Sequence, residues 1–184
     1  MPQTALIVID MLNAYDHEDA DALAGSVKEK LPQIVELRDA GGERDDVMLI
    51  YVQDNHDSWN AERDDLVERA CQGRHPELVE PIAPVGRVAL LQKGRHSIFY
   101  ETALNHLLKV EEVQRVILIG QVTEQCILYS ALDAYLRGYE VVVPPDAVAH
   151  IDEAFAKAAL GMMERNMHAD LVPAADVFSY SRNS

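Results

Sequence analysis

Short apolar runs recur along the chain, and most of them are continuous rather than alternating. They cover residues 5–9, 47–52, 88–92, 113–120 and 139–144, with a weaker run at 169–173. Continuous runs of this length are typical of strands that are covered on both faces, as in a parallel sheet. The pattern therefore predicts a mostly parallel sheet of about six strands.

Helical patterns fill the intervals between these runs. Apolar positions at three- and four-residue steps predict helices over residues 20–40, 60–71, 100–110, 123–137 and 152–166. Strands that alternate with helices predict right-handed crossovers and a three-layer α/β/α sandwich of the Rossmann-like kind. Because no repeat or linker interrupts the 184 residues, we expect one domain over residues 1–184.

Composition narrows the class of protein. The chain is 48% apolar and 26% charged, which indicates a globular protein. Its 16 basic and 31 acidic residues give a net charge of −15, which argues against nucleic-acid and anionic membrane partners. Two cysteines make no disulfide framework, and the N-terminal run lacks a basic leader. We therefore expect a cytoplasmic protein.

Three groups of complementary chemistry follow the predicted strands. Asp10 comes directly after the first strand, Lys93 after the third, and Cys126 shortly after the fourth. Ligands of an open parallel sheet bind beyond the carboxyl ends of its strands. We therefore expect a carboxylate, an amine and a thiol to meet at one edge of the sheet.

The position of Cys126 favours a reactive thiol. It opens a predicted helix, where the helix dipole and the free backbone N–H groups lower a thiol pKa and can hold an oxyanion. The alternative is a buried, inert cysteine that packs as a small hydrophobic residue. Asp10 likewise has a purely structural alternative, as a carboxylate that caps a loop.

Three stretches of sequence, in order, resemble the isochorismatase-like cysteine hydrolases. This family includes nicotinamidases, N-carbamoylsarcosine amidases, and ureide or carbamoyl amidohydrolases. The stretch ALIVIDMLNAY contains Asp10, QKGRHSIFYETAL contains Lys93, and IGQVTEQCILYSALDAYLRGYEVVVPPDAVA contains Cys126. The resemblance covers nearly the whole chain. It implies that these three residues are a catalytic triad that hydrolyses a C–N bond of a small amide, carbamoyl or ureide substrate through a thioester.

The resemblance also implies the geometry around the nucleophile. In the family the peptide bond that enters this turn is often cis, which here is the bond between Gln121 and Val122. The oxyanion hole is then formed by the backbone N–H groups of Val122 and Cys126. Leu12, Asn13 and Ala14 depart from the family pattern after the first strand, so no particular substrate is implied. We expect substrate contacts from Tyr15, Asn55, Trp59, His96 and Phe99.

The resemblance leaves a metal-dependent alternative open. The family's nicotinamidases bind a divalent metal through an Asp-x-His motif and further histidines. This chain has Asp54, His56 and His75, but it lacks a histidine between the last two. We therefore expect no metal and no cofactor, and we interpret the acidic run at 16–21 as a helix entry.

Three further hypotheses remain beside the cysteine amidohydrolase. They are a metal-assisted deamidase of the nicotinamidase type, a vinyl-ether hydrolase of the isochorismatase type, and a non-catalytic binding subunit. A dinucleotide-dependent oxidoreductase is a poor fit, because no GxGxxG motif follows the first strand. The expected partners are a small-molecule substrate and further copies of the chain, in a dimer or tetramer.

Overall fold

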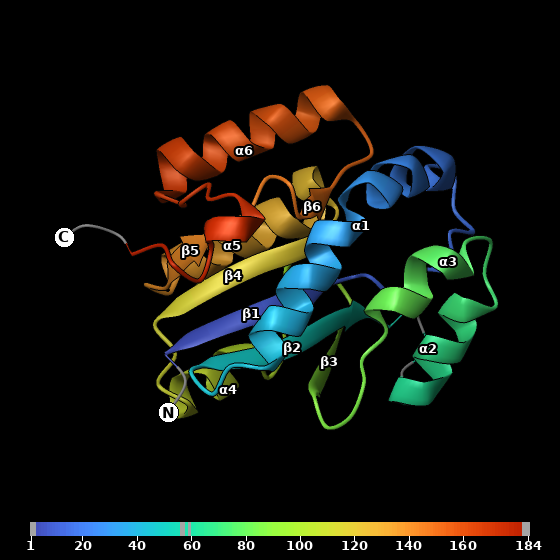
Figure 1. Ribbon diagram of the computed structural model, residues 1–184, viewed down its shortest axis with the longest axis horizontal. Coiled ribbons are helices and arrows are strands. Elements are labelled where there is room, and N and C mark those ends of the chain that lie inside the picture. The colour runs from blue at the N-terminus through green and yellow to red at the C-terminus, as the bar shows by residue number, and fades with distance from the viewer. Residues whose placement is uncertain (1–2, 56–57, 59, 182–184) are drawn as a thin grey trace.

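A parallel sheet forms the centre of the molecule in the computed structural model, which describes residues 3–55, 58 and 60–181 (Figure 1). Its strands are β1 (Thr4–Ile9), β2 (Val47–Asp54), β3 (Ala89–Lys93), β4 (Arg115–Gln121), β5 (Glu140–Val142) and β6 (Val148–Ala149). Their order is β3-β2-β1-β4-β5, β6 lies beside the end of β4, and every pairing is parallel.

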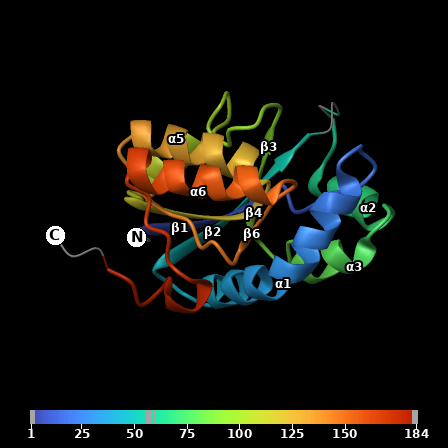
Figure 2. The same cartoon turned by 90° about the horizontal axis from the view of Figure 1, so that it is seen from above.

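Helices cover both faces of this sheet. They are α1 (Ala20–Gly42), α2 (Arg63–Cys71), α3 (Pro76–Val79), α4 (Leu104–Val110), α5 (Leu128–Leu136) and α6 (Glu153–Met167). Figure 2 shows α1 and α3 on one side of the sheet and α5 and α6 on the other. The predicted three-layer α/β/α sandwich is therefore confirmed. Within the part of the chain that the structure describes, no helix has the length and apolarity needed to cross a membrane.

The central strand β1 explains why the apolar runs are continuous. Leu6 and Val8 belong to the core cluster under α1, whereas Ile7 and Ile9 belong to the cluster under α4, α5 and α6. Successive side chains of a strand point to opposite faces, so a strand that is covered on both sides needs apolar residues at every position. All four side chains are fully buried.

The sixth strand differs from the prediction. The run at 169–173 makes only an isolated bridge, between Asp170 and Val142, whereas β6 forms at residues 148–149. Two adjacent prolines follow β5 and have no N–H to donate to a sheet. After them the chain turns and pairs Val148 with Gly120 at the end of β4.

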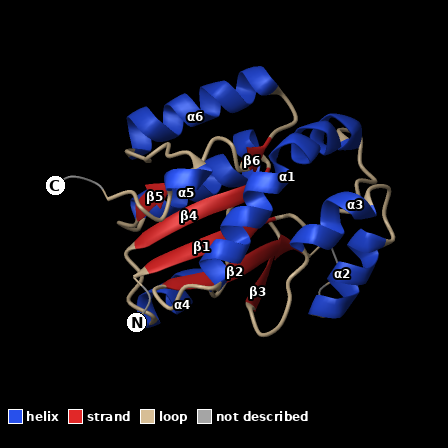
Figure 3. Ribbon diagram, viewed as in Figure 1, coloured by secondary structure: helices blue, strands red, loops and turns tan. Residues whose placement is uncertain are grey.

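Helix α4 begins later than the predicted residue 100. Side-chain hydroxyls hold the preceding segment in turns: Ser97 accepts the N–H of Phe99, and Thr102 accepts the N–H of Leu104. Such local bonds compete with the helical hydrogen-bond pattern. The chain segment that connects β2 to β3 forms the short helices α2 and α3 (Figure 3).

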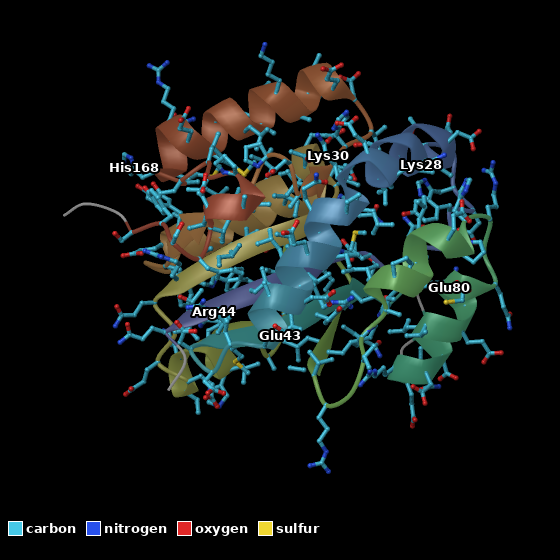
Figure 4. All side chains as sticks on the ribbon, in the orientation of Figure 1. Lys28, Lys30, Glu43, Arg44, Glu80 and His168 are labelled. Atoms are coloured by element: carbon cyan, nitrogen blue, oxygen red, sulfur yellow. The ribbon has the colours of Figure 1, made fainter. Side chains whose placement is uncertain are left out.

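The C-terminal segment packs back onto the far end of α1. Arg44 follows this helix, and its guanidinium lies over the ring of Phe178, 5.1 Å from the ring centroid (Figure 4). Ala174 and Val177 join the same core cluster as α1. These contacts lie at the amino-terminal end of the strands, so the carboxyl ends remain available for a site.

Candidate active site

The three residues singled out from the sequence lie at the carboxyl ends of three parallel strands of the sheet. Asp10 directly follows β1, Lys93 is the last residue of β3, and Cys126 lies in a π-helical turn, Thr123–Ile127, that follows β4. Since β1 pairs with both β2 and β4, and β2 pairs with β3, the strand order itself brings these segments together.

Close packing of β4 against β1 depends on Gly120. Its φ angle is +114°, and a Cβ atom at this position would lie 2.2 Å from the carbonyl oxygen of Ile9. Only glycine fits such an approach without moving the backbone. The turn that carries Cys126 therefore starts directly beside the end of β1, where Asp10 lies.

The geometry around Lys93 defines a buried cluster of charges. Its Nζ atom lies 2.8 Å from Oδ2 of Asp10, 3.6 Å from Sγ of Cys126 and 3.8 Å from Oδ2 of Asp54. Only 2% of Lys93 is exposed. A buried ammonium needs such partners, because desolvation without compensation would be costly. The structure thus brings the acid, the amine and the thiol into direct contact.

Asp10 is held in an unusual backbone conformation. Its φ angle is +55°, in the left-handed region that residues other than glycine rarely adopt. Its N–H donates to the carbonyl of Val52, and its Oδ1 atom accepts the N–H of Asp54. Gln121 donates its side-chain N–H to the carbonyl of Asp10. These bonds aim the second carboxylate oxygen at Lys93.

The electrostatics of Cys126 oppose one expectation from the sequence. Burial, followed by the negative charge and hydrogen bonding of Asp10, raises the pKa of the Cys126 thiol well above its ordinary value. Lys93 and the backbone N–H of Val122 lower this pKa by smaller amounts. The expected lowering by the helix dipole is thus outweighed, and the resting residue is a neutral thiol beside a carboxylate.

Lys93 shows the opposite balance. Burial alone would lower its pKa, but the charge and hydrogen bonding of Asp10, together with its interactions with Cys126 and Asp54, outweigh that effect and raise the pKa above the ordinary value. Lys93 therefore stays an ammonium at neutral pH. It keeps a positive charge beside the sulfur, where it would stabilise a thiolate once one forms.

The peptide bond between Gln121 and Val122 is cis, the geometry that the sequence resemblance implies. The carbonyl oxygen of Val122 accepts the N–H groups of Gln125 and Ile127, which closes the turn around Cys126. The backbone N–H of Val122 lies close enough to the sulfur to lower its pKa. This amide is thus placed next to the atom that would attack a substrate.

A cavity of about 330 Å³ opens at this cluster. Asp10, Lys93 and Cys126 line it together with His96, whose Nδ1 atom lies 3.7 Å from the sulfur. The ring of His96 packs against Tyr129, with 5.6 Å between their centroids. The volume suits a small-molecule ligand.

The predicted substrate contacts divide into three groups. His96 lines the cavity as expected. Tyr15, Asn55 and Phe99 do not line it: they are at most 3% exposed, and the structure places them in the packed interior, which corrects the prediction for these three. Trp59 lies outside the described residues. The aromatic rings were misassigned because a ring that follows a strand packs equally well under a loop.

Several cavity residues are not among those predicted from the sequence. Asn13, His17 and Asp19 come from the segment between β1 and α1 and line the cavity. The acidic run at 16–21 was interpreted as a helix entry, and Asp19 does directly precede α1, but its side chain makes no cap hydrogen bond there. Its place after β1 was the available signal, since such loops surround the ligand in this architecture.

The candidate metal ligands do not gather in one place among the described residues. Asp54 lines the cavity, whereas His75 is absent from the lining, bonds to Glu77 and packs on Tyr15. His56 lies outside the described residues. Across residues 3–55, 58 and 60–181, no three His, Cys, Asp or Glu side chains are grouped as metal ligands would be.

Comparisons with known proteins agree with this fold. Residues 4–176 match the family model described as Isochorismatase domain. An uncharacterized isochorismatase family protein of Bacillus subtilis, YaaI, is 31% identical over 91% of this chain and 92% of its own length. The ureidoacrylate amidohydrolase RutB of Cronobacter sakazakii is 25% identical over 85% of this chain and 79% of its own length. A nicotinamidase from Staphylococcus aureus superposes with a TM-score of 0.70 at 25% identity, over 93% of this chain and 98% of its own.

Proposed function

Because the chain belongs to the isochorismatase family of hydrolases, we propose that it is a cysteine hydrolase that cleaves a C–N bond of a small amide, carbamoyl or ureide substrate through a thioester. The observation that carries this proposal is the contact of Lys93 Nζ with both Asp10, at 2.8 Å, and Cys126, at 3.6 Å. Two similar proteins, the ureidoacrylate amidohydrolase and the nicotinamidase, have names that describe hydrolysis of C–N bonds.

The first half of the reaction follows from the neutral thiol. Asp10 takes the thiol proton as the sulfur of Cys126 attacks the carbonyl carbon, so that a C–S bond forms and the carbonyl oxygen gains the negative charge. The ammonium of Lys93 stabilises the sulfur as it becomes negative. The backbone N–H groups of Val122 and Cys126 are the proposed donors to the oxyanion. When the intermediate collapses, the C–N bond breaks and Asp10 returns its proton to the leaving nitrogen.

The second half regenerates the enzyme. Water replaces the departed amine or ammonia, and Asp10 takes a proton from it as its oxygen attacks the thioester carbon. The C–S bond then breaks, the acid product leaves, and the proton on Asp10 returns to Cys126. One carboxylate therefore serves as base and acid in both halves, and no cofactor takes part.

The proposal is tested by substitution. Cys126→Ala and Asp10→Asn should each lower turnover at least about a thousandfold while the circular dichroism spectrum stays unchanged. The assay is ammonia release from a panel of small amides, ureides and carbamoyl compounds, with Cys126→Ala as the blank. Cys71→Ala is the matched control, because Cys71 lies on α2 and does not line the cavity. Near-normal turnover by either active-site variant would refute the mechanism.

The same assay addresses the metal-assisted alternative. A chelator should leave turnover unchanged if Asp10, Lys93 and Cys126 suffice for the reaction. Loss of activity on chelation, with recovery on adding a divalent metal, would instead favour a deamidase of the nicotinamidase type. Cleavage of a vinyl ether without any ammonia release from the amide panel would favour the isochorismatase type.

A further inference from the structure

Acidic side chains outnumber basic ones in the wall of the proposed catalytic cavity. Asp10, Asp19 and Asp54 line it, and Lys93 is the one lysine or arginine among the described residues of this lining. The imidazoles of His17 and His96 also line it, and they add positive charge only when protonated. At neutral pH the wall therefore carries a net negative charge.

The positive charge of Lys93 is already engaged. Its Nζ atom lies 2.8 Å from Asp10 and 3.8 Å from Asp54, so a substrate carboxylate would have to compete with two protein carboxylates. No other lysine or arginine of the described residues lines the cavity. Arg95 donates to the carbonyl of Gly94 and lines a different hollow, and the lysines of α1, Lys28 and Lys30, lie farther along the helix (Figure 4).

Asp19 is the acid best placed to meet an arriving molecule. It is exposed to solvent, lies one residue before α1, and makes no side-chain cap bond to that helix. Because Asp19 also lines the cavity, its charge is close to any molecule that enters from solvent. The net charge of −15 of the whole chain adds a field of the same sign, which attracts cations toward the cavity.

We propose that the cavity selects substrates by charge and that its preferred substrate is a small amide bearing an ammonium group, with Asp19 as the specificity-determining residue. This inference rests on the proposed function and adds the class of substrate. An ammonium group gains attraction from Asp19 and Asp54 while the amide carbon meets Cys126. A carboxylate in the same place is repelled by both acids.

The first test compares three amides of similar size and different charge. They are 4-aminobutanamide, which is a cation, butanamide, which is neutral, and succinamate, which is an anion. We expect kcat/KM to fall in that order, with at least about a tenfold difference between cation and anion. Asp19→Asn should narrow this difference by about threefold. Glu18→Gln is the matched control, because it removes the same charge next to Asp19 at a position outside the lining.

The second test does not require turnover. Cys126 is labelled, in a Cys71→Ala background, by methanethiosulfonates that carry a trimethylammonium, a sulfonate or a methyl group. Each rate is divided by the rate of the same reagent with 2-mercaptoethanol, which removes intrinsic differences in reactivity. The normalised rate should be highest for the cation and lowest for the anion. High salt and Asp19→Asn should both reduce the ratio of the cation's normalised rate to the anion's normalised rate. Glu18→Gln should leave that ratio unchanged.

The outcomes separate this inference from the proposed function. Equal normalised rates or a preference for the anion would overturn the charge selection. The charge selection would also be overturned if Asp19→Asn and Glu18→Gln changed the preference for the cation to the same extent. A preference for succinamate whose turnover is lost in Cys126→Ala would overturn the charge selection and leave the cysteine mechanism standing. Turnover of the cationic amide that survives Cys126→Ala would instead refute the mechanism.

Discussion

Replacing Lys93 by methionine should destabilise the fold more than any loss of packing explains. The two side chains are similar in length, so the change removes a charge and leaves the space filled. What remains is the carboxylate of Asp10, whose side chain is only 13% exposed, without the ammonium that lay 2.8 Å away. Breaking a buried ion pair from one side costs about 3–5 kcal/mol of unfolding free energy.

We expect strong coupling between the two partners of this ion pair. Asp10→Asn also breaks the pair, but the double variant Asp10→Asn/Lys93→Met leaves neither charge buried alone. The double variant should therefore lose less stability than the two single losses added together, by about 2–3 kcal/mol. Urea unfolding followed by circular dichroism gives the four free energies of this cycle.

A matched ion pair at the surface serves as the control. Lys30 and Glu29 are 2.9 Å apart, nearly the same distance, but the side chain of Glu29 is 71% exposed. The corresponding cycle with Lys30→Met and Glu29→Gln should show a coupling energy below about 1 kcal/mol, because solvent screens such a pair. Additive stability losses at Lys93 and Asp10, or equal coupling energies in the two pairs, would refute the claim that burial makes the Lys93–Asp10 coupling strong.

The pH dependence of the Lys93→Met effect has a definite sign. The pKa of Lys93 is raised in the folded protein, so its contribution is complete below the unfolded value of about 10.4 and is lost as pH rises through the folded value. The stability difference between the parent protein and Lys93→Met should therefore stay constant from about pH 6 to pH 9. A difference that disappears by pH 8 would show that Lys93 is not the charged partner.

Two further predictions concern backbone fit and thiol reactivity. Gly120→Ala should lower the free energy of unfolding in urea by more than about 3 kcal/mol, because the added Cβ would lie 2.2 Å from the carbonyl oxygen of Ile9. Gly25→Ala is the control. Its Cβ would have nothing within 4 Å, so this change should stabilise α1 by about 0.5–1 kcal/mol. Because burial raises the pKa of Cys126, its alkylation by iodoacetamide in the free enzyme should keep accelerating above pH 9. A plateau of the rate below pH 8, measured by mass spectrometry of the peptide that contains Cys126, would contradict this.

The sheet could be predicted because its strands are apolar on both faces. Leu6 and Ile7 are neighbours in sequence that enter different core clusters, and this requirement appears in the sequence as an unbroken run. Strand β6 left no such signal. It has two residues, and its pairing with Gly120 depends on how the chain leaves the prolines after β5. A strand set by a turn cannot be found from hydrophobic periodicity.

The same distinction separates the parts of the candidate site. Asp10, Lys93 and Cys126 follow strands, so the order of a parallel sheet was enough to predict that they meet. Tyr15 and Phe99 sit in turns whose path is set by packing, and the sequence alone did not show that their rings face inward. Substrate contacts were therefore predicted poorly, although the three central groups were found.

The reactivity of Cys126 shows why placement in sequence is an incomplete guide to chemistry. A cysteine in the first turn of a helix gains from the helix dipole, and this gain is worth at most about 2 kcal/mol. Here the thiol is 7% exposed and faces a carboxylate, and both conditions favour the protonated form. A thiol kept neutral in this way is activated only as its proton moves to Asp10. Attack on the substrate and proton transfer are thereby coupled, and an unoccupied site would hold little of the reactive thiolate.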